Sequence, residues 1–262
     1  EDHHFSANGI ISHNCIQINL EKLFSNGFCS GHGYIREPNS IRSYAALGCI
    51  AIQASQNDFF GGQSVNLYET ILRGSDLFDD YVKIVDDDVL PKYLDEDSLE
   101  DAIQDFIDHN DDDTYSTKVI RQCFNFAFKQ ACSDVEEETS QAMEAVIFNL
   151  NTMQSRAGSQ VPFSSLNLGC DTTHEGRLIT KKLLDALYKG LGHNETSIFP
   201  IVVFQLKSGI NYNSSDPNYD LFKQAIKCSA KRLFPTYMNE DATYNAQYYD
   251  PKNKQTLCAT MG

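Results

Sequence analysis

The run of residues 199–206 constrains the fold more than any other feature, because its centre, Ile-Val-Val-Phe at 201–204, is apolar at four consecutive positions. A strand that is apolar on both faces needs cover on both, as in parallel sheets. A second strand is expected at 161–168. Helical patterns are expected at 40–56, 142–151, 180–191 and 216–234. This alternation of helix and strand predicts an α/β fold, either layered or closed into a barrel.

Local signals predict where three of these helices begin or end. Ser40 is suited to cap the first helix, since its hydroxyl can accept a hydrogen bond from a free backbone N–H. Gly190 or Gly192 is expected to end the third, because glycine adopts the left-handed backbone that closes a helix. Pro217 is expected in the first turn of the fourth, where the missing N–H has no cost.

Acidic residues are concentrated in one segment. Of the 36 acidic side chains, 16 lie within residues 76–113, beside only two basic ones. Apolar residues recur at helical spacing between 99 and 107, which predicts a helix with one apolar face. We therefore expect an acidic helical insertion on the surface. A calcium loop is rejected, because Asp113 stands where the tight turn needs glycine and Val119 where the closing glutamate belongs.

The overall composition excludes several classes of protein. The formal net charge of −15 argues against direct nucleic-acid binding, which needs basic surface to neutralise phosphates. The longest apolar runs are far shorter than the roughly 20 residues of a membrane span. The eight cysteines are scattered and form no Cys-x-x-Cys pair. A reducing compartment, the cytoplasm, is therefore expected.

The first fourteen residues, which end in His13-Asn14 and precede Cys15, closely resemble the C-terminal splicing block of inteins. In such a block an asparagine attacks its own carbonyl and breaks the bond to the next residue, while a histidine protonates the departing nitrogen. Before that, the cysteine thiol takes the upstream segment as a thioester. The resemblance assigns these roles to Asn14, His13 and Cys15, with His3 assisting. We expect 1–14 to be an intein remnant that cannot splice alone; an ordinary β hairpin is the alternative.

Residues 15–262 resemble the catalytic subunit of anaerobic, class III ribonucleotide reductases, which are glycyl radical enzymes. The resemblance covers nearly all of this segment. It is carried by 14–20 (NCIQINL), 36–41 (REPNSI), 61–64 (GGQS), the polar stretch 149–167, 199–201 (FPI), 216–222 (DPNYDLF) and 230–235 (AKRLFP). Together these motifs are highly specific.

The resemblance implies the first half of a ten-stranded α/β barrel. In the family a thiyl radical abstracts the 3′ hydrogen of a ribonucleoside triphosphate, and loss of the 2′ hydroxyl gives the deoxynucleotide for DNA synthesis. Cys15 matches the cysteine on the first barrel strand that faces the substrate and takes part in the reduction. A thiol there can donate a hydrogen atom to a sugar radical. Formate supplies the remaining electrons in one branch of the family, and a thiol protein in others.

Other parts of the family's machinery have no counterpart in these residues. The radical cysteine follows a Met-Gly pair, and the chain stops at Met261-Gly262. The glycyl radical loop and its zinc site are expected in a missing C-terminal part, so this fragment is expected to be inactive alone. A second intein junction after Gly262 is suspected. The resemblance also implies a radical-SAM activating enzyme as a partner and a homodimer in the full protein.

Candidate binding residues follow from position and polarity within the family's frame. Ser164, Ser165 and Asn167 are predicted as substrate-binding residues in a polar loop. ATP and deoxynucleotide effectors are expected near the dimer interface around 36–42, where Arg36 and Arg42 are suited to a triphosphate. Asn39 stands where relatives often carry a lysine.

The sequence also leaves two alternatives to the reductase hypothesis. In the first, the chain is a segment of a splicing precursor whose chemistry lies at the Asn14/Cys15 junction. In the second, it belongs to a different glycyl radical enzyme, such as a lyase. The polar stretch 156–167 argues against the second, because it resembles the nucleotide reductases specifically.

Overall fold

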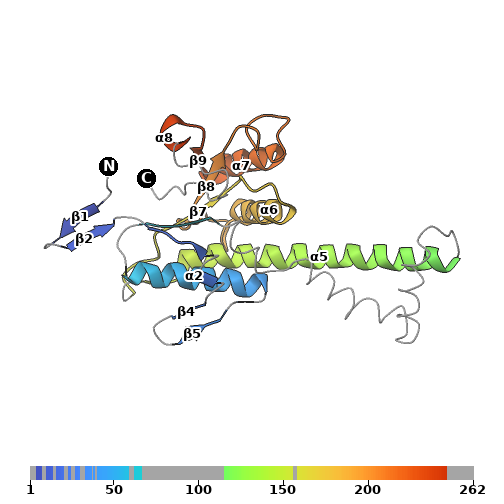
Figure 1. Ribbon diagram of the computed structural model, residues 1–262, viewed down its shortest axis with the longest axis horizontal. Coiled ribbons are helices and arrows are strands. Elements are labelled where there is room, and N and C mark those ends of the chain that lie inside the picture. Colours follow the sequence, from blue (N-terminus) through green and yellow to red (C-terminus); the bar gives the residue numbers. More distant parts are fainter. Residues whose placement is uncertain are drawn as a thin grey trace. The chain divides into compact units, whose positions relative to one another are not determined.

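The computed structural model describes residues 4–7, 10–13, 16–20, 23–24, 27–29, 33–36, 38, 40–58, 62–66, 115–155 and 158–246 (Figure 1). The chain divides into two compact units. The first comprises Glu1–Gly74 and Thr139–Gly262, and the second comprises Ser75–Glu138. The predicted acidic insertion, 76–113, lies outside the described residues.

The first unit is built on a five-stranded parallel sheet with the strand order β3-β6-β7-β8-β9. Its strands are β3 (Ile16–Gln17), β6 (Gln63–Asn66), β7 (Ser164–Leu168), β8 (Ile201–Leu206) and β9 (Thr236–Asn239). Each strand pairs with the next one along the chain, as expected when helical connections return the chain to the same edge. The predicted α/β class with a parallel sheet is therefore confirmed.

Two short antiparallel hairpins precede the long helices. β1 (His4–Ala7) pairs with β2 (Ile10–His13), and β4 (Phe28–Cys29) pairs with β5 (Tyr34–Ile35). The first hairpin lies within the segment that resembles an intein block.

The helices whose bounds lie within the described residues are α2 (Ile41–Asp58), α5 (Tyr115–Thr152), α6 (His174–Lys189), α7 (Tyr219–Arg232) and α8 (Thr243–Ala246). α5 begins in the second unit and ends in the first. None of the described helices is long and apolar enough to cross a membrane.

The predicted helix ends are largely confirmed. The Ser40 hydroxyl accepts a hydrogen bond from the backbone N–H of Ser43 at 3.3 Å, so it caps α2 as expected. Gly190 ends α6 with φ of +80°, and its N–H donates to the carbonyl of Ala186. The prediction that Pro217 lies in the first turn of α7 is wrong, because Asn218 is the N-cap and α7 begins at Tyr219, two residues after the proline.

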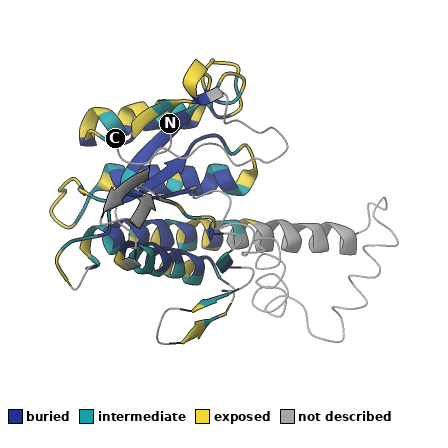
Figure 2. Cartoon of the chain, turned by 60° about the vertical axis from the view of Figure 1, so that its left-hand side comes forward, coloured by how far each residue is buried: buried dark blue, intermediate teal, exposed yellow. Residues whose placement is uncertain are grey.

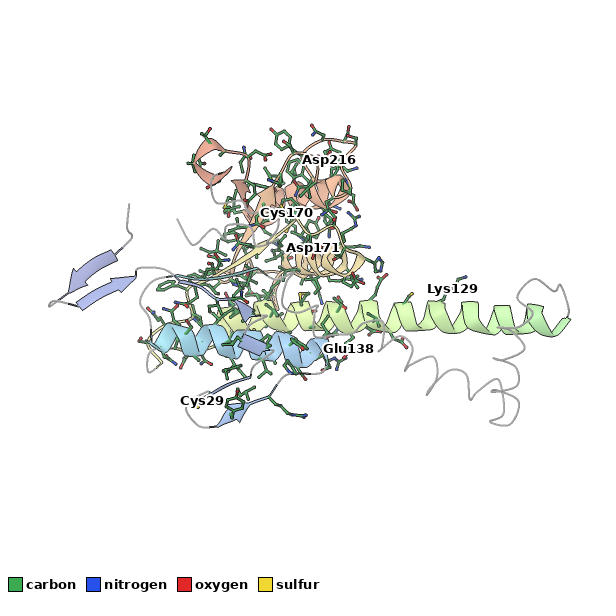
Figure 3. All side chains as sticks on the ribbon, viewed as in Figure 1. Cys29, Lys129, Glu138, Cys170, Asp171 and Asp216 are labelled. Carbon is green, nitrogen blue, oxygen red and sulfur yellow. The ribbon has the colours of Figure 1, made fainter. Side chains whose placement is uncertain are left out.

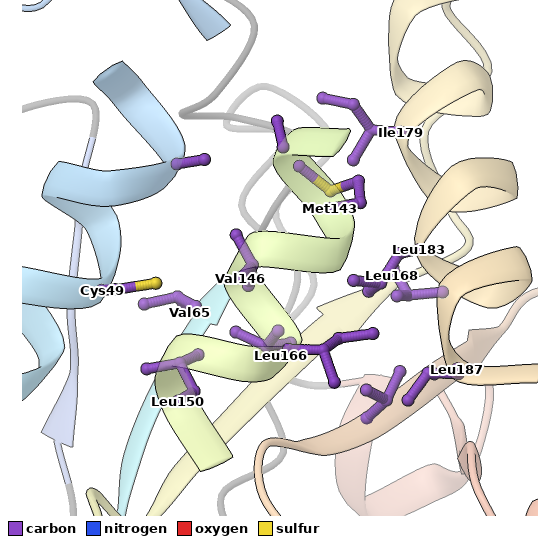
Figure 4. Close-up of a cluster of buried hydrophobic side chains, with 14 of the residues drawn as sticks. Cys49, Val65, Met143, Val146, Leu150, Leu166, Leu168, Ile179, Leu183 and Leu187 are labelled. Carbon is purple, nitrogen blue, oxygen red and sulfur yellow. The ribbon is translucent and has the colours of Figure 1, made fainter. Parts of the chain in front are cut away.

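One apolar cluster joins the helices of the first unit to the sheet. Val65, Leu166, Leu168, Val202 and Phe204 project from β6, β7 and β8 and are fully buried. Figure 4 shows Met143, Val146 and Leu150 of α5 packed between α2 and α6 over these strands. In Figure 2 the buried residues gather where helices meet the sheet, and exposed residues lie on the outer helix surfaces. Truncating one such buried side chain to alanine costs about 2–5 kcal/mol of stability.

Candidate functional site

The sheet has a second face that is polar. Side chains alternate along a strand, so the neighbours of Leu166 and Leu168 in β7 point away from the helix-packed cluster. The strand register aligns a set of such neighbours across β6, β7 and β8, and those with described side chains are Ser64, Ser165, Asn167, Ile201, Val203 and Gln205. Four of these six are polar, and Ile201 and Val203 are apolar. A row of polar side chains therefore runs across the sheet on the face opposite the apolar cluster.

These polar side chains are completely shielded. Ser64, Ser165, Asn167 and Gln205 are each 0% exposed. The Asn167 amide nitrogen donates to the backbone carbonyl of Val65 at 3.5 Å, which is a long bond. The Ser165 hydroxyl has no hydrogen-bond partner among the described residues. A buried hydroxyl without a partner costs about 1–3 kcal/mol, so this arrangement is one that a bound polar group would stabilise.

The three predicted substrate-binding residues lie in the strand β7 and not in a loop, which corrects that part of the prediction. Ser165 and Asn167 share the polar face. Ser164 lies on the opposite face, because it is two residues from Leu166 and side chains at i and i+2 of a strand share a face. Its hydroxyl donates a hydrogen bond to the carbonyl of Pro162 at 3.4 Å. The structure therefore brings two of the three together and separates the third.

Amide side chains tie the preceding polar stretch to α2. The Gln56 side-chain oxygen accepts a hydrogen bond from the Phe163 N–H at 3.0 Å, and Gln53 donates to the Gln154 carbonyl. Ser55 donates to the Gln63 side chain at 2.5 Å. These contacts thus give some of the many polar residues in 149–167 a structural role. Arg156 lies outside the described residues.

The carboxyl ends of β7 and β8 are fixed by two fully buried asparagines. Asn211 donates to the carbonyls of Gly169 and Gln205 at 2.9 and 2.8 Å. Asn218 donates to the same Gly169 carbonyl at 3.1 Å and to that of Asp171 at 2.6 Å. Ligands in α/β proteins often bind at the carboxyl ends of parallel strands. The two asparagines therefore fix the backbone at the edge of the sheet where a ligand is expected.

Ionisable side chains gather at the same edge, one or two residues beyond their strands. Cys170 follows β7, Lys207 follows β8, and Glu240 and Asp241 follow β9; Figure 3 labels Cys170. The Lys207 ammonium lies 3.5 Å from the Asp241 carboxylate, which also accepts a hydrogen bond from the Ser208 N–H at 2.7 Å. Glu240 is 1% exposed, and neither of its carboxylate oxygens has a partner among the described residues.

Burial sets the protonation of this group. Desolvation raises the pKa of Glu240 to about 7, an effect that the Lys207 charge opposes and the Asp241 charge assists. Burial and the charge of Glu240 raise the pKa of the Cys170 thiol to about 12. Cys170 is therefore a protonated thiol at neutral pH, whereas Glu240 is poised between its two forms.

Other predicted residues lie elsewhere or outside the described residues. His3, Asn14, Cys15 and Asn39 are not described, and His13 is described only as a backbone position of β2 that pairs with His4. Arg36 follows β5 and Arg42 lies in the first turn of α2, and both are exposed.

Sequence reasoning missed Lys207, Gln205 and Glu240. The sequence offers one usable signal: a charged residue directly after an apolar run, as Lys207 follows Phe204-Gln205-Leu206. No comparable signal marks Glu240, because β9 (Thr-Tyr-Met-Asn) lacks an apolar run.

Within the described ranges, no group of three or more His, Cys, Asp or Glu side chains is placed to hold a metal ion. The site consists instead of hydroxyls, amides, one ammonium and two carboxyl groups at the polar face and its carboxyl edge. The molecule is thus an α/β protein with a buried polar site on a parallel sheet.

Comparison with known proteins specifies this class further. The family model for anaerobic ribonucleoside-triphosphate reductase matches residues 2–262, so the chain belongs to that family. The chain is 29% identical over 230 residues to the anaerobic ribonucleoside-triphosphate reductase of Haemophilus influenzae, an alignment that covers 87% of this chain and 28% of that protein. It is 29% identical over 224 residues to the protein of the same name from Enterobacteria phage T4, covering 85% of this chain and 31% of that protein. The chain thus spans less than a third of the length of these relatives.

Proposed function

We propose that this chain is part of an enzyme that reduces ribonucleoside triphosphates to deoxyribonucleotides by thiyl and glycyl radical chemistry. Membership of the reductase family supports the reaction. The observation that carries a nucleotide site in these residues is the buried polar row on β6, β7 and β8, in which the Ser165 hydroxyl has no partner among the described residues. Cys15, two positions before Gln17 of β3, is proposed to donate a hydrogen atom during the reduction.

The proposal includes a ten-stranded barrel of which these strands are one half. Five parallel strands in sequential order, with helices packed on a single apolar face, are what such a half requires. The polar face is then the interior of the barrel. Ser165 and Asn167 face that interior and are proposed to bind substrate, whereas Ser164 packs on the helix side and is withdrawn from the set.

The remaining components are proposed from the family. The glycyl radical and a zinc site are assigned to parts of the protein outside this chain, together with formate or a thiol protein as reductant. A radical-SAM activating enzyme, a homodimeric assembly and a cytoplasmic location complete the proposal. ATP and deoxynucleotide effectors are proposed to bind near Arg36, Asn39 and Arg42. The fragment alone is expected to be inactive.

A second function is proposed for the first fourteen residues in the precursor, namely protein splicing at Asn14 and Cys15. It rests on the sequence of the block, and His13 and His3 are its proposed assisting residues. His4–Ala7 pairs antiparallel with Ile10–His13, as expected for the ordinary alternative, a β hairpin. The reductase family model begins at residue 2 and so includes this segment.

The reductase proposal is tested on the full-length protein that contains this chain, activated under anaerobic conditions. Deoxynucleotide formation from each ribonucleoside triphosphate is measured for the wild type, Ser165→Ala and the neighbouring control Ser164→Ala. We expect turnover by the wild type, a KM raised about tenfold in Ser165→Ala because one hydrogen bond to substrate is lost, and little change in Ser164→Ala. Absence of deoxynucleotide from the activated wild type would refute the reductase. Equal effects of both substitutions would refute the assignment of the polar face.

A further inference from the structure

Glu240 is the described residue with the most unsatisfied polar atoms. Both carboxylate oxygens lack a hydrogen-bond partner among the described residues, although the side chain is 1% exposed and water cannot reach it freely. Burying an unpaired carboxyl group is costly, and native proteins satisfy such a group with a bound water, an ion or a ligand, or retain it where its proton is used. The location of Glu240 on the sheet and the charges around it limit the kind of ligand group that its carboxylate can bind.

Glu240 extends the polar row of the sheet. The register of β8 and β9 pairs Gln205 with Met238, so the alternation of side chains places the position of Glu240, two residues further on, on the face of Gln205. The Glu240 N–H donates to the Leu206 carbonyl at 2.9 Å, which continues the parallel pairing past the end of β9. The carboxyl group thus lies at the carboxyl edge of the polar face.

The charges around Glu240 limit the ligand group that it can accept. Lys207 from the end of β8 and Asp241 from the end of β9 act on it electrostatically, and Cys170 from the end of β7 responds to its charge. The Lys207 ammonium disfavours a cationic ligand group, and the two carboxyl groups disfavour an anionic one. A neutral group with hydrogen-bond donors remains.

We infer that Glu240 is a ribose-binding residue, whose two carboxylate oxygens accept hydrogen bonds from the neighbouring 2′ and 3′ hydroxyls of a ribonucleotide on the polar face. This inference rests on the proposed function. Two acceptor oxygens on one carbon match two hydroxyls on neighbouring carbons. Carboxylates near the carboxyl ends of parallel strands bind ribose hydroxyls in dinucleotide-binding folds, so the geometry has a precedent in a different architecture.

The test uses the full-length activated protein at a fixed, saturating effector concentration. We measure KM for a ribonucleoside triphosphate and the competitive inhibition constant of its 2′,3′-dideoxy analogue, for the wild type, Glu240→Gln and the control Glu195→Gln, which changes an exposed carboxylate outside the site. Glu240→Gln is expected to raise KM about tenfold and to leave the inhibition constant of the analogue unchanged, because the analogue has no hydroxyls to offer. Glu195→Gln is expected to change neither constant.

Two results would overturn the inference while leaving the reductase proposal intact. One is an unchanged KM in Glu240→Gln, and the other is an equal change for the substrate and its dideoxy analogue. A wild type without turnover overturns both proposals together. If the Glu240→Gln variant does not fold, Glu240→Asp replaces it. Aspartate keeps the carboxyl group on a shorter side chain, so this variant should give a KM between those of the wild type and Glu240→Gln.

A pH series gives an independent readout. In the wild type KM should fall between pH 6 and pH 8, because the ionised Glu240 accepts two hydrogen bonds and the protonated form accepts fewer. Cys170 stays protonated over this range, since burial raises the pKa of its thiol to about 12. The Glu240→Gln variant should lose this dependence, and a dependence that persists in the variant counts against the inference.

Discussion

Arg232 in α7 donates two hydrogen bonds to one carbonyl, that of Tyr188 at the end of α6, through Nε at 3.0 Å and Nη2 at 2.8 Å. The same guanidinium also donates to the carbonyls of Lys189 and Asn194 at 2.7 and 2.6 Å. A helix leaves its last carbonyls without intrahelical partners, and this side chain, 4% exposed, satisfies those of Tyr188 and Lys189 in α6. The positive charge also lies at the negative end of the helix dipole.

Replacing Arg232 with Met should therefore destabilise the protein by about 2–4 kcal/mol, because buried carbonyls lose a charged donor. Urea unfolding of the full-length protein measures the change. Lys227→Met is the matched control on the same helix: it removes only a cation 5.3 Å from the Tyr188 ring and should cost at most about 1 kcal/mol. A similar loss in the two variants would contradict the capping role.

Gly169, at the end of β7, cannot carry a side chain without strain. Its φ is +113°, and a Cβ atom there would meet the Phe204 ring at 3.0 Å and the Gln205 carbonyl at 3.1 Å. Gly169→Ala should cost more than about 2 kcal/mol. Gly209 has a φ of +81° but open space where a Cβ atom would lie. Gly209→Ala therefore measures the cost of the backbone conformation alone and should destabilise the protein by about 1 kcal/mol. Thermal unfolding that ranks these two variants in the opposite order would refute the packing argument.

Stability should fall as pH rises, because of Glu240. Its pKa is raised from 4.5 to about 7 by burial, so between these values the folded state binds more protons than the unfolded state and loses stability with rising pH. The total effect is about 2 kcal/mol, allowing for relaxation of the site. Glu240→Gln should lack this component. The difference in unfolding free energy between the two proteins, measured from pH 4 to pH 8, should grow in favour of the variant, and a constant difference would show that Glu240 titrates normally.

Thiol reactivity should follow burial. Burial raises the pKa of the Cys49 and Cys170 thiols to about 12, so their thiolate fraction at neutral pH is very small. Cys29 is exposed. Alkylation of the native protein, followed by peptide mapping, should therefore modify Cys29 well before Cys49 and Cys170. In urea the three should react at similar rates, and early modification of Cys170 in the native protein would contradict its burial.

The splicing proposal makes the side chain of Asn14 necessary for cleavage. In the full precursor, Asn14→Ala should block release of the intein, because the side-chain amide that breaks the bond to Cys15 is gone. Asn8→Ala, in the same block, is the control and should splice. The intact mass of the product distinguishes spliced from unspliced protein, and normal splicing by Asn14→Ala would exclude an intein. Cys15→Ser should impair both splicing and ribonucleotide reduction.

The strongest sequence patterns predicted the corresponding elements closely. The apolar run at 199–206 became β8 (Ile201–Leu206), and the pattern at 40–56 became α2 (Ile41–Asp58), since in both cases a buried face dictates the residue type. The pattern at 142–151 found only the end of α5, because residues 115–141 lack a clear apolar stripe. β9 was missed because its side chains are mostly exposed and carry no apolar run.

The site was only partly predictable for a related reason. Ser165 and Asn167 stood out by polarity within an otherwise apolar strand, but Ser164 could be separated from them only once the strand parity was known. Lys207 and Glu240 approach each other through the pairing of β8 with β9, and that pairing joins positions more than thirty residues apart. Long-range register of this kind is not encoded in any local pattern.

The two asparagines that share the Gly169 carbonyl have a consequence for experiments on this edge of the sheet. Asn211 and Asn218 join the end of β7 to the segment between β8 and α7 through neutral amide groups. Neutral contacts of this kind are insensitive to ionic strength and do not titrate. The frame should therefore hold its shape across buffers that alter the nearby carboxyl groups, so that a spectroscopic label placed there would report the proton on Glu240 against a fixed background.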